Sequence, residues 1–285
     1  MMDTILNLGL NDKTVKALAD NSKDLRFAYD CYRRFIQMFA NVVLDIELDA
    51  FEDALHEVKQ RLDVTYDYQI PAEELQEMVS KFKGIVKEKV GKPFPQDPWV
   101  QLKMAIEAVF KSWNNKRAVT YRKIANIPDD LGTAVTVMEM VFGNLGEDCG
   151  TGVLFTRNPS TGEKKLFGEF LINAQGEDVV AGIRTPQPIS LLKEVNLELY
   201  SELARVAELL EKHFRDMQDI EFTVERGKLY ILQTRSGKRT AKAAVKVAAD
   251  MVNEGIIDEQ TAVTRVTPRE IEQLLHRQVD PSVQL

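Results

Sequence analysis

The sequence contains little of what marks a metal–sulfur centre, a redox site or a membrane protein. Among its 285 residues are only two cysteines, Cys31 and Cys149. They lie far apart and fit no metal-ligand spacing, so we interpret both as ordinary thiols of a reducing compartment. The hydrophobic runs are all much shorter than a membrane span. The start of the chain lacks the basic and apolar regions of a signal peptide, and we therefore predict a soluble, cytoplasmic protein without a membrane partner.

An excess of positive charge is also missing. The 37 lysines and arginines are outnumbered by 44 aspartates and glutamates, which gives a formal net charge of -7. Such a chain has no surplus cations with which to neutralise phosphates, and this argues against nucleic acid as its main partner. The length suits one large domain or two modest ones, and a hydrophobic content of 44% is enough to form a core.

The first third of the chain is predicted to be helical. Residues 1–95 contain few glycines, and acidic residues that can cap helices precede apolar stripes. The stripe that follows Asp24 consists of Phe27, Cys31, Phe35, Met38 and Phe39. Because no catalytic group of residues is recognisable here, we interpret this part as a helical subdomain that forms a cover or an insertion.

A proline-rich linker at residues 91–98 leads into another predicted helix. Asp97 can cap this helix, whose predicted apolar face is Leu102, Ile106, Val109, Phe110 and Trp113. A basic patch follows, formed by Lys116, Arg117, Arg122 and Lys123. The patch is either a solvated helix end or a docking site for a phosphate or an acidic domain.

From residue 132 onward the pattern changes to strands and glycine-containing turns. Residues 133–141 are an apolar run typical of a buried strand, and a glycine turn at residues 150–152 leads into the next strand. Later segments predict a strand at 165–173, helices at 196–217, 240–252 and 258–275, and a linker or cut end at 277–285. We therefore predict an α+β fold, in which helices pack on a mixed sheet beside the helical subdomain.

Residues 219–235 are predicted to form a β-hairpin. Its first arm alternates polar with apolar residues, the apolar ones being Ile220, Phe222 and Val224. Residues 225–227 supply the turn, and a type I turn closed by a glycine bulge would place Val224 opposite Lys228. In that register the odd-numbered residues of both arms share one face, which carries Asp219, Glu221, Gln233 and Arg235.

This polar face suggests a particular chemistry. Carboxylate and amide oxygens are the ligands that Mg²⁺ uses in proteins, and a guanidinium group binds phosphate oxygens. The four side chains therefore suit a site for a metal ion and the phosphates of a nucleotide. A solvated hairpin face with a surface ion pair explains the same residues without any ligand, and the hairpin alone does not exclude this interpretation.

Several long segments resemble the nucleotide-binding region of pyruvate phosphate dikinases. They are MMDTILNLG at residues 1–9, CYRRFIQMF at 31–39, VFGN at 141–144, GTGVLFTRNPSTGE at 150–163, GEFLINAQGEDVVAGIRTP at 168–186, and the two arms of the hairpin at 219–235. The resemblance extends over essentially the whole chain. Phosphoenolpyruvate synthase and related dikinases share some of these segments, but the helical first part is more similar to the pyruvate enzyme.

The resemblance implies an ATP-grasp fold and the reaction ATP + phosphate + pyruvate ⇌ AMP + diphosphate + phosphoenolpyruvate. It implies that the nucleotide domain passes the β-phosphoryl group of ATP to a histidine on a separate swivelling domain, and that a barrel domain passes it to pyruvate. It also divides the chain into a helical subdomain (1–95), the remainder of a first ATP-grasp subdomain (96–139), a second subdomain with the metal and phosphate site (140–238) and a helical linker (239–285).

The same resemblance implies roles for individual residues. Glu221 and Gln233 would hold Mg²⁺ and phosphate, Arg235 would clamp phosphate, and Asp219 would support the site or contact the nucleotide. The backbone that binds adenine would belong to Glu139, Met140 and Val141. The flexible loop over the phosphates would be formed by Gly150, Thr151 and Gly152.

The chain departs from the family in three ways. An upstream segment with a phosphate-binding lysine and arginine, the acceptor motif Gly-Gly-x-Thr-Ser-His and the barrel are all missing from the sequence. We therefore expect a fragment that cannot complete the reaction alone. The shortened sheet would have an open strand edge, which favours aggregation or a homodimer. The competing hypothesis is a non-catalytic interaction module with a vestigial ATP site.

Overall fold

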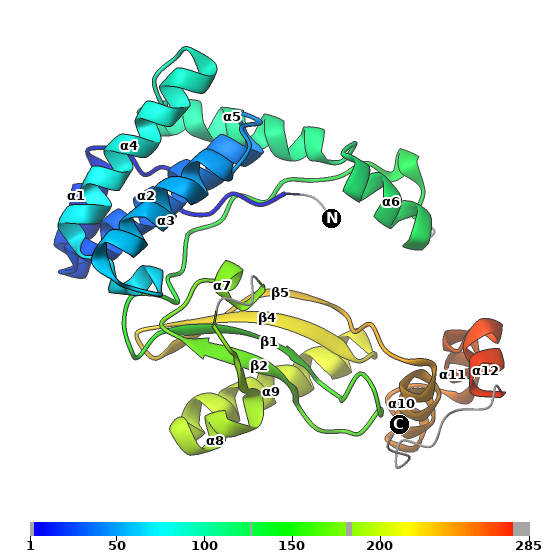
Figure 1. Cartoon of the computed structure of the whole chain (residues 1–285). Helices are drawn as coiled ribbons and strands as arrows, with labels where there is room; N and C mark the ends of the chain where they lie inside the picture. The colour runs from blue at the N-terminus through cyan, green and yellow to red at the C-terminus, as the bar shows by residue number, and fades with distance from the viewer. Residues whose placement is uncertain (1–2, 126, 181–183, 276–285) are drawn as a thin grey trace, which may run out of the picture. The chain divides into compact units, whose positions relative to one another are not determined.

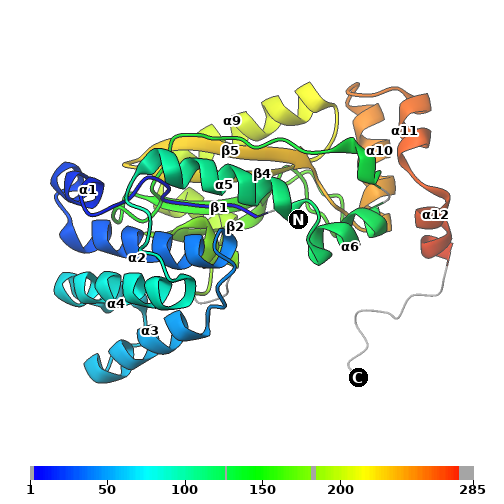
Figure 2. The ribbon, with the colours of Figure 1, turned by 90° about the horizontal axis from the view of Figure 1, so that it is seen from above.

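The computed structural model describes residues 3–125, 127–180 and 184–275. It divides into two compact units, Met1–Met140 and Val141–Leu285 (Figures 1 and 2). The predicted linker at residues 277–285 and parts of two resembling segments, residues 1–2 and 181–183, lie outside the described residues. Within the described ranges, no helix is long and apolar enough to cross a membrane.

The first unit is built from helices. They are α1 (Thr14–Ser22), α2 (Leu25–Val42), α3 (Asp49–Leu62), α4 (Ala72–Val90), α5 (Pro98–Ser112) and α6 (Lys116–Ala125), with short 3-10 turns at Asp67–Gln69 and Asp129–Leu131. The Asp24 carboxylate accepts a hydrogen bond from the Phe27 backbone N–H at 2.9 Å and caps α2. Helix α2 lies beside α4 (Figure 2), and the helical character predicted for residues 1–95 is confirmed.

A buried charged cluster joins α2 to the 3-10 turn at Asp67–Gln69. Asp30, which is 3% exposed, accepts hydrogen bonds from Arg33 and Arg34. Arg33 also contacts the Asp67 carboxylate at 3.1 Å. Burial alone would raise the pKa of Asp30, but Arg34, Arg33 and Arg26 together hold that pKa well below its usual range. The charged cluster therefore attaches the turn to α2 without leaving an uncompensated carboxylate.

Helix α5 presents a different face to its unit from the one predicted. The buried residues are Gln101, Ala105 and Ser112, whereas Phe110 of the predicted apolar face is 47% exposed. The Gln101 amide donates to the Leu10 and Pro95 carbonyl oxygens and accepts from the Gly9 N–H. Since buried backbone groups need hydrogen-bond partners, these three bonds stabilise the packing of this side of α5 against the segments that contain Leu10 and Pro95.

The prediction of a buried strand at residues 133–141 is wrong. The segment forms neither a helix nor a strand, and Val137 and Met138 are 60% and 59% exposed. A strand is defined by ladder hydrogen bonds to a neighbour, and no described strand pairs with this segment. The apolar run at residues 133–141 is therefore not sufficient to place this segment in the described sheet.

The second unit contains one sheet with the order β3-β2-β1-β4-β5. Its strands are β1 (Gly150–Phe155), β2 (Phe167–Ile172), β3 (Gln187–Pro188), β4 (Gln218–Glu225) and β5 (Lys228–Ser236). Its helices are α7 (Gly176–Val180), α8 (Leu192–Val195), α9 (Leu197–Phe214), α10 (Ala241–Asn253), α11 (Glu259–Arg265) and α12 (Pro268–Leu275), with a 3-10 turn at Ile189–Leu191. The α+β class is confirmed, although every pairing between the described strands is antiparallel rather than mixed.

One face of the sheet packs against α9 and forms the core of the second unit. Ile220, Phe222 and Val224 of β4 belong to this core, which also includes Leu203 and Ala207 of α9. Because side chains alternate along a strand, the odd-numbered residues of β4 lie on the opposite face. The core therefore determines which side of the sheet carries the polar residues of the hairpin.

The predicted flexible glycine loop at residues 150–152 is instead part of β1, a strand inside the sheet. A Cβ atom on Gly152 would lie 2.5 Å from the Glu169 carbonyl oxygen and 2.7 Å from the Phe222 ring. Glycine is required at this position because the neighbouring strand and the core leave no room for a side chain.

The helices after the sheet are attached to it by a buried ion cluster. Arg157, which is completely buried, pairs with Glu211 of α9 at 2.7 Å and with Glu254, at the end of α10, at 2.8 Å. A second cluster joins Arg239 to Asp216. Helix α10 therefore packs as part of the second unit, and the four-part division of the chain stays a prediction.

We predict that Gly152→Ala destabilises the second unit by about 1–3 kcal/mol, the usual cost of overpacking a close-packed site. Urea unfolding followed by circular dichroism measures this loss. Gly84→Ala in α4 is the control, since a Cβ there meets no atom within 4 Å and should stabilise its helix by about 0.5–1 kcal/mol. Equal stability of Gly152→Ala and wild type would contradict the close packing at β1.

Candidate functional site

The hairpin β4–β5 is formed as predicted, but its turn is not. Glu225 pairs with Lys228, so the loop has two residues, Arg226 and Gly227, instead of three. Both have positive φ, 51° and 75°, as a type I′ turn requires. The prediction that Val224 faces Lys228 is therefore wrong by one residue.

A bulge farther along the hairpin restores the predicted face. The register shifts between Glu221 and Phe222, where Leu232 is the additional residue on β5. Beyond this bulge, Glu221 pairs with Gln233 and Asp219 pairs with Arg235. All four side chains therefore share the face of the sheet that is opposite α9, although the predicted reason for it was wrong.

Arg235 links the two carboxylates of this polar face. Its Nε donates to Asp219 Oδ2 at 2.8 Å, and its Nη2 lies 3.5 Å from Glu221 Oε1. The Asp219 side chain is only 10% exposed, whereas those of Glu221 and Arg235 are 37% and 49% exposed. One partly exposed cation thus compensates two carboxylates at a position that a soluble ligand can reach.

The sheet adds two groups to this face that the sequence analysis did not single out. Glu169 of β2 pairs with Val153 of β1, which pairs with Glu221, so Glu169 lies two strands away at roughly 10 Å. Thr223 lies beside Thr151, with their hydroxyl oxygens 3.2 Å apart. Only the pairing of distant segments brings these residues together, and no local signal in the sequence indicates it.

Among the other predicted nucleotide-binding residues of the second unit, Thr151 alone is placed on this face by the strand pairing. Glu139 is exposed and, with Met140 and Val141, lies outside the helices and strands, at the point of the sequence where one unit ends and the next begins. Gly150 and Gly152 pair with Val224 and Phe222 and lie on the core face of the sheet, while Thr151 lies on the same face as Glu221. Their roles in binding ATP therefore stay predictions.

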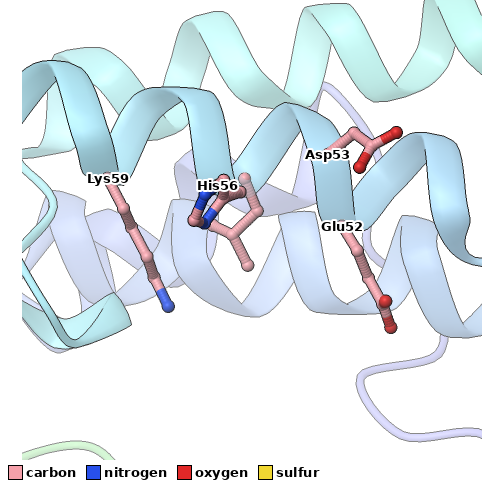
Figure 3. Close-up of a pocket in the computed structure, with 5 residues that line it drawn as sticks. Glu52, Asp53, His56 and Lys59 are labelled. Carbon is pink, nitrogen blue, oxygen red and sulfur yellow. The ribbon is translucent and has the colours of Figure 1, made fainter.

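A surface hollow on α3 is unconnected with this chemistry. It is lined by Glu52, Asp53, Leu55, His56 and Lys59 (Figure 3). These side chains all come from one helix, and the His56 ring interacts with Gln60 at 2.7 Å. We assign no function to the hollow, because all the described residues that line it belong to the single helix α3.

Comparison with known proteins identifies the family. The family described as "Pyruvate phosphate dikinase, AMP/ATP-binding domain" matches residues 1–200 and 192–255. The chain belongs to this family.

Its relatives are long enzymes. The chain is 55% identical to pyruvate, phosphate dikinases of Rhizobium meliloti (strain 1021) and Clostridium symbiosum, and 56% identical to the chloroplastic enzyme of Mesembryanthemum crystallinum. These alignments cover 99% of this chain but only 33%, 32% and 30% of the relatives. The chain thus spans about a third of the length of the relatives that it matches.

The polar face of β4–β5 fits a divalent cation only together with another oxygen donor. In the described part of the chain, no cluster of three or more His, Cys, Asp or Glu side chains is placed to hold a metal ion. Glu221 and Asp219 supply carboxylate oxygens, and Gln233 supplies an amide oxygen. Mg²⁺ commonly binds through one or two carboxylates plus phosphate oxygens, so the donor set is that of a metal that arrives with a phosphate ligand.

We predict that Arg235→Met raises the affinity for Mn²⁺ in the absence of nucleotide. The guanidinium and a divalent cation compete for the same carboxylates, and removal of one partly exposed ion pair is worth about 1 kcal/mol, or roughly fivefold. Electron paramagnetic resonance of free Mn²⁺ measures the binding. Arg239→Met is the matched control, because Arg239 pairs with Asp216 outside this face. Unchanged or weaker Mn²⁺ binding by Arg235→Met would contradict the competition.

Proposed function

We propose that the chain is the ATP-binding part of a pyruvate phosphate dikinase, and that the polar face of β4–β5 binds Mg²⁺ and the phosphates of ATP. The observation that carries the proposal is the pairing of Asp219 with Arg235 and of Glu221 with Gln233 on one accessible face. The names of the relatives favour a pyruvate, phosphate dikinase over a phosphoenolpyruvate synthase.

The proposed reaction is ATP + phosphate + pyruvate ⇌ AMP + diphosphate + phosphoenolpyruvate. In it the β-phosphoryl group moves first to a histidine on a separate domain. The acceptor motif is absent from this sequence, where the histidines are His56, His213 and His276. We therefore propose that the chain binds and orients ATP but does not complete the reaction alone.

The contribution of this chain is positioning and charge neutralisation. Phosphoryl transfer depends mainly on aligned groups and compensated charge rather than on covalent chemistry by the nucleotide-binding domain. Bound Mg²⁺ would neutralise charge on the phosphate oxygens. Arg235 would turn its guanidinium toward those oxygens, and Glu221 and Gln233 would orient them. Asp219, which is mostly buried, would keep Arg235 in place.

Further parts of the proposal rest on the family resemblance. Glu139, Met140 and Val141 would bind adenine through their backbone, and Gly150, Thr151 and Gly152 would lie close to the phosphates. The histidine-carrying domain would be a partner of this chain. The cytoplasmic location and the homodimer stay predictions.

We predict that Glu221→Gln weakens binding of Mg·ATP about tenfold, equivalent to about 1.4 kcal/mol, and that it changes binding of Mg²⁺-free ATP much less. The substitution preserves size but removes a charged metal ligand. Isothermal titration calorimetry measures both affinities. Glu202→Gln, at an exposed position of α9, should leave both unchanged. Equal affinity of Glu221→Gln and wild type for Mg·ATP would favour the interaction module with a vestigial site.

A further inference from the structure

The turn between β4 and β5 holds both ends of the loop at residues 142–149. At one end of the loop, the Phe142 backbone N–H donates to the Glu225 carboxylate at 2.7 Å. At the other end, the Gly227 backbone N–H donates to the Asp148 carbonyl oxygen at 2.9 Å. Glu225 and Gly227, two residues apart in the hairpin, therefore hold two points of the loop that are six residues apart.

The opposite side of the same loop is held by the chain that follows β2. The Ala174 N–H donates to the Gly143 carbonyl oxygen at 2.9 Å, and the Asn173 N–H donates to the Cys149 carbonyl oxygen at 2.9 Å. A Cβ atom on Gly143 would lie only 2.4 Å from the Ala174 carbonyl oxygen. The loop is thus fixed by backbone contacts, with Glu225 as the side chain that holds Phe142.

Glu225 belongs to the hairpin that carries the polar face. It is four residues from Glu221 along β4, a separation of roughly 13 Å at the usual rise of a strand. Phe142 directly follows Val141, the last of the three residues proposed to bind adenine. The hairpin therefore connects, through one hydrogen bond, the end of the proposed adenine-binding segment to the proposed phosphate site.

We propose that Glu225 is a positioning residue for the adenine end of ATP. Its carboxylate holds the Phe142 N–H and thereby sets how far Val141 lies from Glu221 and Arg235. A bond from N–H to a carboxylate is stronger than one to a neutral acceptor, so the carboxylate holds this end of the loop firmly. The inference rests on the proposed function, because it assigns Glu225 to the adenine end of that same ligand.

The proposal is tested by comparing a ligand that has the base with one that lacks it. Mg·ATP and Mg·tripolyphosphate are titrated by calorimetry into wild type, Glu225→Ala and Glu225→Gln, with Glu202→Ala as an exposed control. Glu225→Ala should weaken Mg·ATP about tenfold and Mg·tripolyphosphate less than about twofold. Glu225→Gln should stay within about threefold of wild type for both ligands, because its amide oxygen can still accept from Phe142.

Hydrogen exchange of the nucleotide-free protein gives a second readout. The Phe142 amide should exchange about tenfold faster in Glu225→Ala, the effect of losing about 1.4 kcal/mol of protection. Equal losses for both ligands would show a merely structural role and overturn the inference, as would unchanged Mg·ATP affinity or unchanged exchange at Phe142. If wild type binds neither ligand, the proposed function fails. This outcome is distinguishable from failure of the inference about Glu225, because it is measured on the wild-type protein alone.

Discussion

The second unit depends on the antiparallel pairing of β4 with a strand on each side. This pairing gives β4 two different faces, because its even-numbered residues pack on α9 and its odd-numbered residues face the other way. Burial of Ile220, Phe222 and Val224 in the core therefore forces Asp219 and Glu221 to the opposite face. The pairing of β1 with β4 also explains why position 152 is a glycine. It places this residue beside the Phe222 ring, which leaves no room for a side chain.

The bulge at Leu232 brings the polar residues of β4 and those of β5 to the same face of the sheet. If the register at the turn continued, Glu221 would pair with Leu232, and Gln233 would lie opposite Ile220 on the core face. The extra residue moves Gln233 and Arg235 to the face of the carboxylates. Bulges recur next to functional sites for this reason, since one inserted residue re-aims every side chain beyond it.

Charge compensation follows a similar logic in both units. Asp30 in the first unit and Arg157 in the second are buried and have partners of opposite charge, which lie on the same helix for Asp30 and on other elements for Arg157. These partners are needed because an unpaired buried charge is very costly. Arg235 differs from these groups, since it is about half exposed while it pairs with Asp219. A partly exposed cation of this kind can exchange one set of oxygen partners for another at a small cost in free energy.

The sequence by itself determined the helical first part and the hairpin, because these features depend on local periodicity, capping residues and turn residues. It also singled out the four residues of the polar face, but the bulge at Leu232, and not the predicted turn, brings them to one face. Tertiary structure decided the rest. Helix α5 buries Gln101 rather than its predicted apolar face, no described strand pairs with residues 133–141, and strand pairing puts the predicted glycine loop inside β1. These outcomes depend on hydrogen bonds between segments that are far apart in the sequence. A local sequence pattern does not show which distant segments will form such bonds.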